Sequence, residues 1–221
     1  MKVYFISGLG ADSRAFRHIQ LPEGFTAVYL DWIKPMKNEP LTDYAMRLSE
    51  RINKTERFAL VGLSMGGMMA IEIAKRFPPV FTILLSSVSC SAHLPFYFRV
   101  AAKLRLQKMV PISLLKSGSF IKRFFTAETS EDKKLMRQLI RETDPAFIRW
   151  AIDAILRWNC EDFSGPYIHI HGTRDGILPS RYTKPTHTIT RAGHLMVLTK
   201  ANEINRILAE TLSTLQQTVS Y

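Results

Sequence analysis

Short apolar runs alternate with segments of helical spacing along almost the whole chain. Six of these runs are rich in β-branched and aromatic residues, and they are continuously apolar rather than apolar at every second position. A strand with this pattern belongs in a sheet that is covered on both faces. The pattern predicts strands over 2–7, 25–31, 57–62, 80–88, 167–171 and 186–190.

Helical spacing fills the intervals between these runs. The predicted helices in these intervals cover 13–19, 41–52, 65–76 and 203–215. Thr42 or its neighbours can cap the second of them, and Pro78 and Pro79 follow the end of the third. Strands that alternate with helices predict an α/β fold, with a mostly parallel central sheet flanked by helices, as a single domain over 1–221.

One long interval, 91–163, holds no convincing strand. It offers three helical segments, and the last begins at Asp144-Pro145, a favourable pair for a helix start. One helix suffices to cross between neighbouring strands, so the sequence predicts an inserted helical lid over about 91–163 and a core formed by 1–90 and 164–221. The three segments are 95–109, 130–142 and 145–158.

A single serine, Ser64, stands between the third strand and its helix in the pattern G-x-S-x-G. This pattern is typical of a nucleophile elbow, a sharp turn at which only glycine fits two positions before and after the serine. The turn also places the N–H of Met65 at a helix N-terminus, where negative charge is stabilised. We expect Gly67 to let the helix pack closely against the sheet. An ordinary tight turn with an incidental serine is the alternative.

A serine nucleophile needs a histidine as base and a carboxylate to orient it, in the chain order Ser, acid, His. Asp175 follows the fifth predicted strand, and His194 follows the sixth. Loops at the carboxyl ends of parallel strands converge on one edge of a sheet, so we predict that Ser64, Asp175 and His194 meet. Taken singly, Asp175 also fits a solvated turn and His194 a plain loop. His169 and His171, which lie in a strand, are predicted to be structural.

The loop after the first strand, SGLGADSRAF, is expected to supply the second oxyanion-binding amide. Gly8 and Gly10 flank Leu9, so the backbone can turn sharply and direct the Leu9 N–H into the site. The same glycines begin a dinucleotide-binding pattern, but its sixth position is Ser13, so that fingerprint fails.

At this point the sequence resembles the α/β-hydrolase superfamily, over about 1–90 and 164–218. The resemblance implies that Ser64 is the nucleophile, His194 the general base and Asp175 its orienting acid, with oxyanion amides from Leu9 and Met65. It implies no metal and no cofactor. The matching segments are SGLGAD at 7–12, GLSMGG at 62–67, HGTRDGILP at 171–179 and AGHLMV at 192–197.

Two features distinguish this chain within the superfamily. It resembles a short form without the amino-terminal antiparallel strands, and it has Ser7-Gly8 where many members have His-Gly before the oxyanion residue. A serine nucleophile argues against the dehalogenase and epoxide hydrolase members. The resemblance predicts a carboxylesterase-like serine hydrolase that cleaves an ester-like bond of a small or medium apolar substrate. Alternatives are a signalling member with slow turnover, and a thioesterase or lipid hydrolase that uses a basic lid.

Composition adds limits on class and compartment. The chain is 46% hydrophobic and 22% charged, as is usual for globular proteins, and it has no long apolar run and no signal-peptide pattern. We therefore expect a cytoplasmic protein. Its two cysteines, Cys90 and Cys160, have no CxxC spacing and are predicted to be free buried thiols, a lone disulfide being the alternative.

The net charge is +11, and it is unevenly distributed. Residues 91–127 hold seven Lys or Arg and no Asp or Glu, interleaved with apolar side chains. Three interpretations stay open: a solvated face over an apolar pocket, a weak contact with an anionic membrane surface, or an anionic substrate. No recognition motif accompanies the charge, so nucleic-acid binding is not expected. The oligomeric state stays open.

Overall fold

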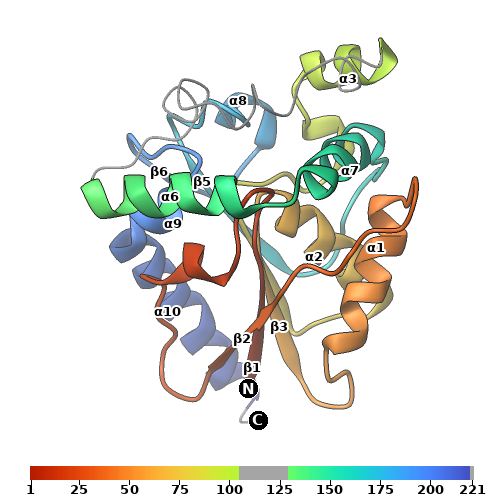
Figure 1. Ribbon diagram of the computed structural model, residues 1–221. Helices are drawn as coiled ribbons and strands as arrows, with labels where there is room; N and C mark the ends of the chain where they lie inside the picture. Colours follow the sequence, from red (N-terminus) through yellow and green to blue (C-terminus); the bar gives the residue numbers. More distant parts are fainter. Residues whose placement is uncertain (105–128, 220–221) are drawn as a thin grey trace.

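The computed structural model describes residues 1–104 and 129–219. At its centre six parallel strands form one sheet in the order β2-β1-β3-β4-β5-β6 (Figure 1). The pairings are in parallel register, for example Ile6 of β1 opposite Gly62 of β3. The strands are β1 (Lys2–Ile6), β2 (Thr26–Leu30), β3 (Phe58–Leu63), β4 (Phe81–Leu85), β5 (Tyr167–Gly172) and β6 (His187–Ile189).

Two apolar cores lie on the two faces of this sheet, because successive side chains of a strand point in opposite directions. Tyr4 and Ile6 of β1 enter one core, while Val3 and Phe5 enter the other. The first core is covered by α1 (Leu41–Leu48), α2 (Met65–Arg76) and α7 (Pro145–Arg157). The second is covered by η1 (Ser13–Phe16), α6 (Ser130–Glu142), α9 (Met196–Thr199) and α10 (Ala201–Val219).

The prediction of a parallel α/β sheet is confirmed, with differences at the ends of elements. The fourth strand ends at Leu85 rather than at residue 88, because Ser86 takes a left-handed conformation with φ of 46°. The first helical stretch is a single 3₁₀ turn, η1, which Asp12 caps. Helix α1 begins after Pro40 without a side-chain cap, so the prediction of a cap by Thr42 or its neighbours is wrong.

Three described helices occupy the interval between β4 and β5: α3 (Phe96–Lys103), α6 and α7. Helix α7 packs against α1, and the rings of Trp150 and Tyr44 lie 4.3 Å apart. Short elements complete the described chain: η2 (Ser49–Arg51), η3 (Ser91–His93) and α8 (Ser180–Thr183). The prediction that 91–163 acts as a lid stays a prediction, and its residues 105–128 lie outside the described part of the chain.

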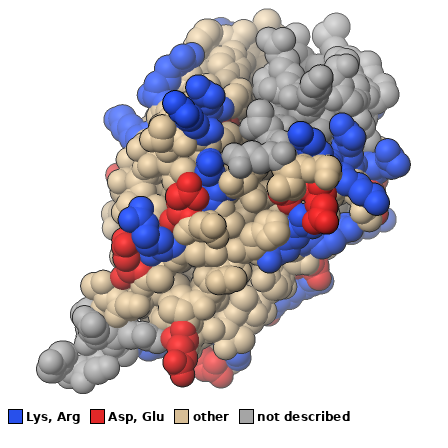
Figure 2. All heavy atoms as spheres, turned by 90° about the vertical axis from the view of Figure 1, so that its left-hand side faces the viewer, with Lys and Arg blue, Asp and Glu red and all other residues tan. Residues whose placement is uncertain are grey.

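Both cysteines are buried and free, as predicted. Figure 2 shows that basic side chains lie over the upper part of the face that carries α6, α9 and α10, with acidic side chains among them. Of the seven basic residues between 91 and 127, Arg99 and Lys103 on α3 are described, and the contact with an anionic partner stays a prediction. No helix within 1–104 or 129–219 is long and apolar enough to cross a membrane.

Candidate active site

Ser64 stands at the junction of β3 and α2 in a strained backbone conformation, with φ of 53° and ψ of −119°. Non-glycine residues rarely adopt positive φ, and such strain persists only where the surroundings enforce it. Here the Ser64 N–H donates to the carbonyl of Leu85 at 2.9 Å. The Ser64 carbonyl accepts from the Gly67 N–H at 2.9 Å and from Ser87 Oγ at 2.7 Å. Neighbouring β4 and its loop therefore hold the turn.

The glycines around Ser64 are required by close backbone approach. A Cβ on Gly62 would lie 2.5 Å from the carbonyl carbon of Gly66, and one on Gly66 would lie 2.6 Å from that of Ile6. Side chains at both positions would collide, as the elbow pattern predicts. Gly67 has a related role, since a Cβ there would lie 2.6 Å from the Ser87 Cβ in the loop after β4.

The three predicted residues Ser64, Asp175 and His194 come together at the carboxyl edge of the sheet. His194 Nε2 lies 2.9 Å from Ser64 Oγ across 130 residues of sequence, and His194 Nδ1 lies 2.7 Å from Asp175 Oδ2. An ionised carboxylate can only accept hydrogen bonds, so His194 Nδ1 donates to Asp175. In this tautomer His194 Nε2 carries no hydrogen and can accept the proton of Ser64. The geometry fits a nucleophile, a base and an orienting acid.

Asp175 is buried in a loop that keeps it ionised. The N–H groups of Ile177 and Leu178 donate to Oδ1 at 2.9 and 2.8 Å. Burial by itself would raise the pKa of Asp175, but the adjacent His194 and the hydrogen bonds from His171 and His194 outweigh burial and hold that pKa well below its ordinary value. The carboxylate is thus a fixed negative charge behind His194.

The loop after β1 lies against the nucleophile. A Cβ on Gly8 would come 3.2 Å from the Ser64 Cβ, so this loop passes beside Ser64 at Gly8, the residue before Leu9. Among the described residues the Leu9 N–H has no backbone partner. The Met65 N–H occupies the first position of α2, where helices leave N–H groups unpaired. The oxyanion-binding role of these two amides stays a prediction.

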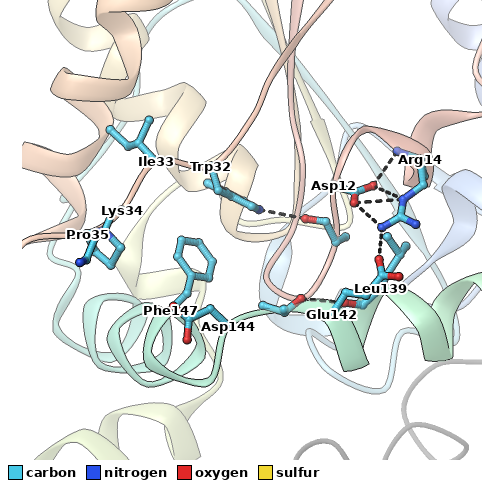
Figure 3. Close-up of a pocket in the computed structure, with 12 residues that line it drawn as sticks. Asp12, Arg14, Trp32, Ile33, Lys34, Pro35, Leu139, Glu142, Asp144 and Phe147 are labelled. Carbon is cyan, nitrogen blue, oxygen red and sulfur yellow. Dashed lines mark hydrogen bonds and ion pairs between the residues drawn. The ribbon is translucent and has the colours of Figure 1, made fainter.

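Two side chains hold this loop, Ser7, which the sequence comparison had named, and Trp32, which it had not. Ser7 Oγ donates to the Ala11 carbonyl at 3.0 Å. Trp32 Nε1 donates to the same oxygen at 2.9 Å (Figure 3). Ser7 therefore has a local hydrogen-bonding role at the position where many hydrolases have histidine. Trp32 lies just after β2, the strand that pairs with β1. The sequence indicated its contact with the loop after β1 only through the expected closeness of these two strand ends.

A hollow of about 490 Å³ lies beside this loop, lined by Trp32, Lys34, Phe147 and the ion cluster of Arg14 with Asp12 and Glu142 (Figure 3). None of Ser64, Asp175 and His194 lines it. The hollow therefore adjoins the loop after β1 at Ala11 and Asp12, and the three candidate residues do not line it.

His169 and His171 lie side by side beneath the triad, fully buried. His171 Nε2 is 2.7 Å from the Leu178 carbonyl and 3.2 Å from Asp175 Oδ2. Treating His171 as a purely structural strand residue overlooked this contact with the candidate acid. The sequence offered one indication of this contact, because His171 and Asp175 are four residues apart in HGTRD and a single turn joins them.

A parallel sheet in this strand order, with a serine at the elbow and an acid and a histidine after later strands, defines the α/β-hydrolase class. The sequence model of the alpha/beta hydrolase family matches residues 3–207, and the chain belongs to this family. The uncharacterized protein Rv2715 of Mycobacterium tuberculosis is 23% identical over 230 residues, covering 88% of this chain and 67% of that protein.

Several solved structures share the fold. MenH from S. aureus aligns with a TM-score of 0.75 at 16% identity, over 98% of this chain and 94% of that one. The esterase EaEST from Exiguobacterium antarcticum gives 0.72 at 18% identity, over 98% and 92%. A thermophilic esterase from Thermogutta terrifontis gives 0.69 at 19% identity, over 97% and 90%. At these identities the likeness shows the fold alone.

Proposed function

We propose that this protein is a serine hydrolase that cleaves an ester-like acyl bond through an acyl-enzyme. The observation that carries the proposal is the continuous hydrogen-bonded chain from Ser64 Oγ through His194 to Asp175, with 2.9 and 2.7 Å links. A serine hydroxyl is a weak nucleophile until a base accepts its proton. The hydrogen bond to Asp175 holds the hydrogen of His194 on Nδ1, so that Nε2 can act as this base.

The proposed reaction proceeds in two halves. His194 Nε2 accepts the Ser64 proton while Oγ attacks the carbonyl carbon, and the oxyanion accepts hydrogen bonds from the Leu9 and Met65 amides. The His194 imidazolium then gives the proton to the leaving oxygen, which departs as an alcohol. Water repeats the sequence: His194 removes its proton, the hydroxyl attacks the acyl carbon, and Ser64 leaves with the proton as the acid forms.

Asp175 contributes by holding His194 and stabilising its imidazolium form rather than by accepting a proton, because its own pKa is lowered. The oxyanion amides are each worth about 10²–10³ in rate in comparable enzymes. Two structural relatives are named esterases, which supports an oxygen ester as the first substrate class to try. A small or medium apolar acyl group remains our proposed preference.

The test combines labelling with turnover. A fluorophosphonate should label the wild type and fail on Ser64→Ala, whereas Ser91→Ala, a serine outside the triad, should label normally. Hydrolysis of p-nitrophenyl esters of graded chain length should fall by about 10⁴–10⁶ in Ser64→Ala or His194→Ala, and little further in the double variant. Equal labelling of wild type and Ser64→Ala would refute the assignment.

The same ester panel separates an enzyme from a member of the family with slow turnover. Multiple turnovers at above about one per second, within the usual range for enzymes, would support the proposal. One equivalent of p-nitrophenol released per protein, followed by a stable acyl-serine, would instead favour a sensor that uses the same pocket.

A further inference from the structure

The hydrogen-bonded chain at the site does not end at Asp175. It continues into the sheet through two side chains of β5: His171 Nε2 approaches Asp175 Oδ2, and His171 Nδ1 lies 3.0 Å from His169 Nε2. All of these groups are buried, and both histidine side chains have zero exposure. Neither histidine takes part in the proposed reaction, and two imidazoles in a core are costly unless their hydrogen bonds are satisfied.

The partners of the two rings determine where the protons lie. His171 Nε2 faces two groups that can only accept, the Leu178 carbonyl at 2.7 Å and the Asp175 carboxylate at 3.2 Å, so Nε2 carries a hydrogen. A neutral His171 then accepts at Nδ1, and His169 must donate from its own Nε2. This leaves His169 Nδ1 without a hydrogen, which agrees with its lack of a hydrogen-bond partner.

The electrostatic surroundings favour this neutral arrangement. Burial lowers the pKa of His169 to about 3, with smaller contributions of the same sign from His171 and His93. Backbone hydrogen bonds with Ser87 and Thr183 act in the opposite direction but do not outweigh burial. His169 is therefore neutral, and it donates from Nε2 to the Nδ1 atom of His171, whose tautomer is set by Leu178 and Asp175.

We infer that His171 is a positioning residue for the triad, a second histidine that holds the catalytic aspartate from behind while His194 engages it in front. With it, Asp175 faces four N–H groups: two amides on Oδ1, His194 on Oδ2, and at 3.2 Å from Oδ2 also the His171 Nε2–H that is shared with the Leu178 carbonyl. The second imidazole restricts the rotation of the carboxylate, because it contacts the same oxygen that His194 engages. The His171 N–H also partly offsets the negative charge on Oδ2. It therefore weakens the electrostatic attraction between Asp175 and His194.

This inference rests on the proposed function and predicts a sign for its pH dependence. Without the His171 donor, the charge on Oδ2 acts on His194 alone and favours its imidazolium form. The acid limb of the kcat/KM profile, which reports the free base, should therefore move to higher pH, by about half a unit to one unit. Other ionisable groups near this chain are His93 after β4, Tyr97 on α3, and Arg181 and Tyr182 on α8.

Two substitutions at His171 separate the donor from the bulk of the ring. The amide nitrogen of His171→Gln can reach the position of Nε2, whereas that of His171→Asn stops near Nδ1. We expect His171→Asn to lower kcat by about tenfold to a hundredfold with KM almost unchanged, and to shift the acid limb upward. His171→Gln should restore most of the kcat and most of the wild-type position of the acid limb. His187→Gln makes the same change at a half-buried histidine that is not part of the hydrogen-bonded row of side chains. It should leave kcat and the acid limb as in the wild type.

Histidine ¹⁵N NMR of the wild type tests the proton positions without turnover, and stays informative if the variants fold poorly. It should show a hydrogen on Nε2 and none on Nδ1 in both His169 and His171. A His171 imidazolium, an unmoved acid limb in a folded His171→Asn, or equal losses in the Asn and Gln variants would each overturn the inference. Failure of the proposed function would differ, since the wild type itself would neither hydrolyse esters nor label at Ser64.

Discussion

Gly66→Ala is the smallest change that tests the geometry of the elbow. The new Cβ would lie 2.6 Å from the Ile6 carbonyl carbon, where ordinary contacts begin near 3.4 Å, and it also meets main-chain oxygens of Ile6 and Ser7. These atoms are backbone, so relief requires α2 or the end of β1 to shift by about 1 Å. Alanine improves helix propensity by at most about 1 kcal/mol, whereas overpacking costs about 1–3 kcal/mol, so the collision should dominate.

The backbone atoms that must shift, in Ile6 and Ser7, lead directly into the loop after β1 that we propose binds the oxyanion, so the rate of hydrolysis should fall more than the stability. A displacement of about 1 Å can cost about 100-fold in rate, whereas a loss of 1–2 kcal/mol lowers the Tm of a domain of this size by roughly 2–8 °C. Calorimetry and p-nitrophenyl ester hydrolysis, measured well below Tm, separate the two effects.

Gly165→Ala is the matched control for this experiment. There the three atoms nearest to the added Cβ all belong to the side-chain ring of Phe163, in the loop before β5, and none belongs to the backbone. We expect some loss of stability and full activity. If Gly66→Ala melts and reacts like the wild type, the close approach of α2 to β1 is wrong and the reasoning fails with it.

Two further substitutions and one pH profile test other parts of the structure. Trp32→Phe keeps the ring packing but removes the donor to Ala11, so it should cost about 1 kcal/mol of unfolding free energy in urea melts and slow fluorophosphonate labelling; an unchanged labelling rate would contradict a role in holding the loop. Arg17→Ala removes a 2.5 Å partner of the buried Asp132 carboxylate and should cost about 1.5–3 kcal/mol. Burial by itself would raise the pKa of Asp132, but its hydrogen bonds outweigh burial and lower that pKa. The stabilisation by Arg17 is therefore present above the ordinary aspartate pKa and is lost as the pH falls through the lowered pKa of Asp132. Thermal melts of Arg17→Ala and the wild type should accordingly converge in acid. Because the pKa of Asp175 is also held low, the acid limb of kcat/KM should follow one proton, and a two-proton slope would count against the assignment.

The parts that the sequence predicted are those governed by local pattern and topology. Continuous apolar runs indicated strands buried on both faces, and parallel strand ends must share an edge, so Ser64, Asp175 and His194 could be placed together without coordinates. The glycines at 62 and 66 followed from the sharpness of one turn. Each of these inferences needs only a few neighbouring residues and a general rule.

The parts that the sequence did not predict depend on side chains that meet across the fold. The donation from Trp32 to the Ala11 carbonyl requires the exact path of the loop after β2, which no periodicity encodes. The left-handed Ser86 shortened β4 although its residue type gave no sign of it. His171 was correctly predicted to lie in a strand. The sequence did not predict that the turn after this strand brings Asp175 into contact with the His171 ring.

The all-parallel order of the sheet has a consequence for how this protein acquires activity after synthesis. Each strand pairing must wait for an intervening crossover, so loop-closure entropy is lost before most contacts form, and folding of such topologies is slow. Ser64 and His194 are 130 residues apart, and β5 and β6 must both dock before the two side chains meet. We therefore expect the proposed ester hydrolysis to recover only with the slowest refolding phase, so that labelling of Ser64 would report the last assembly step rather than collapse.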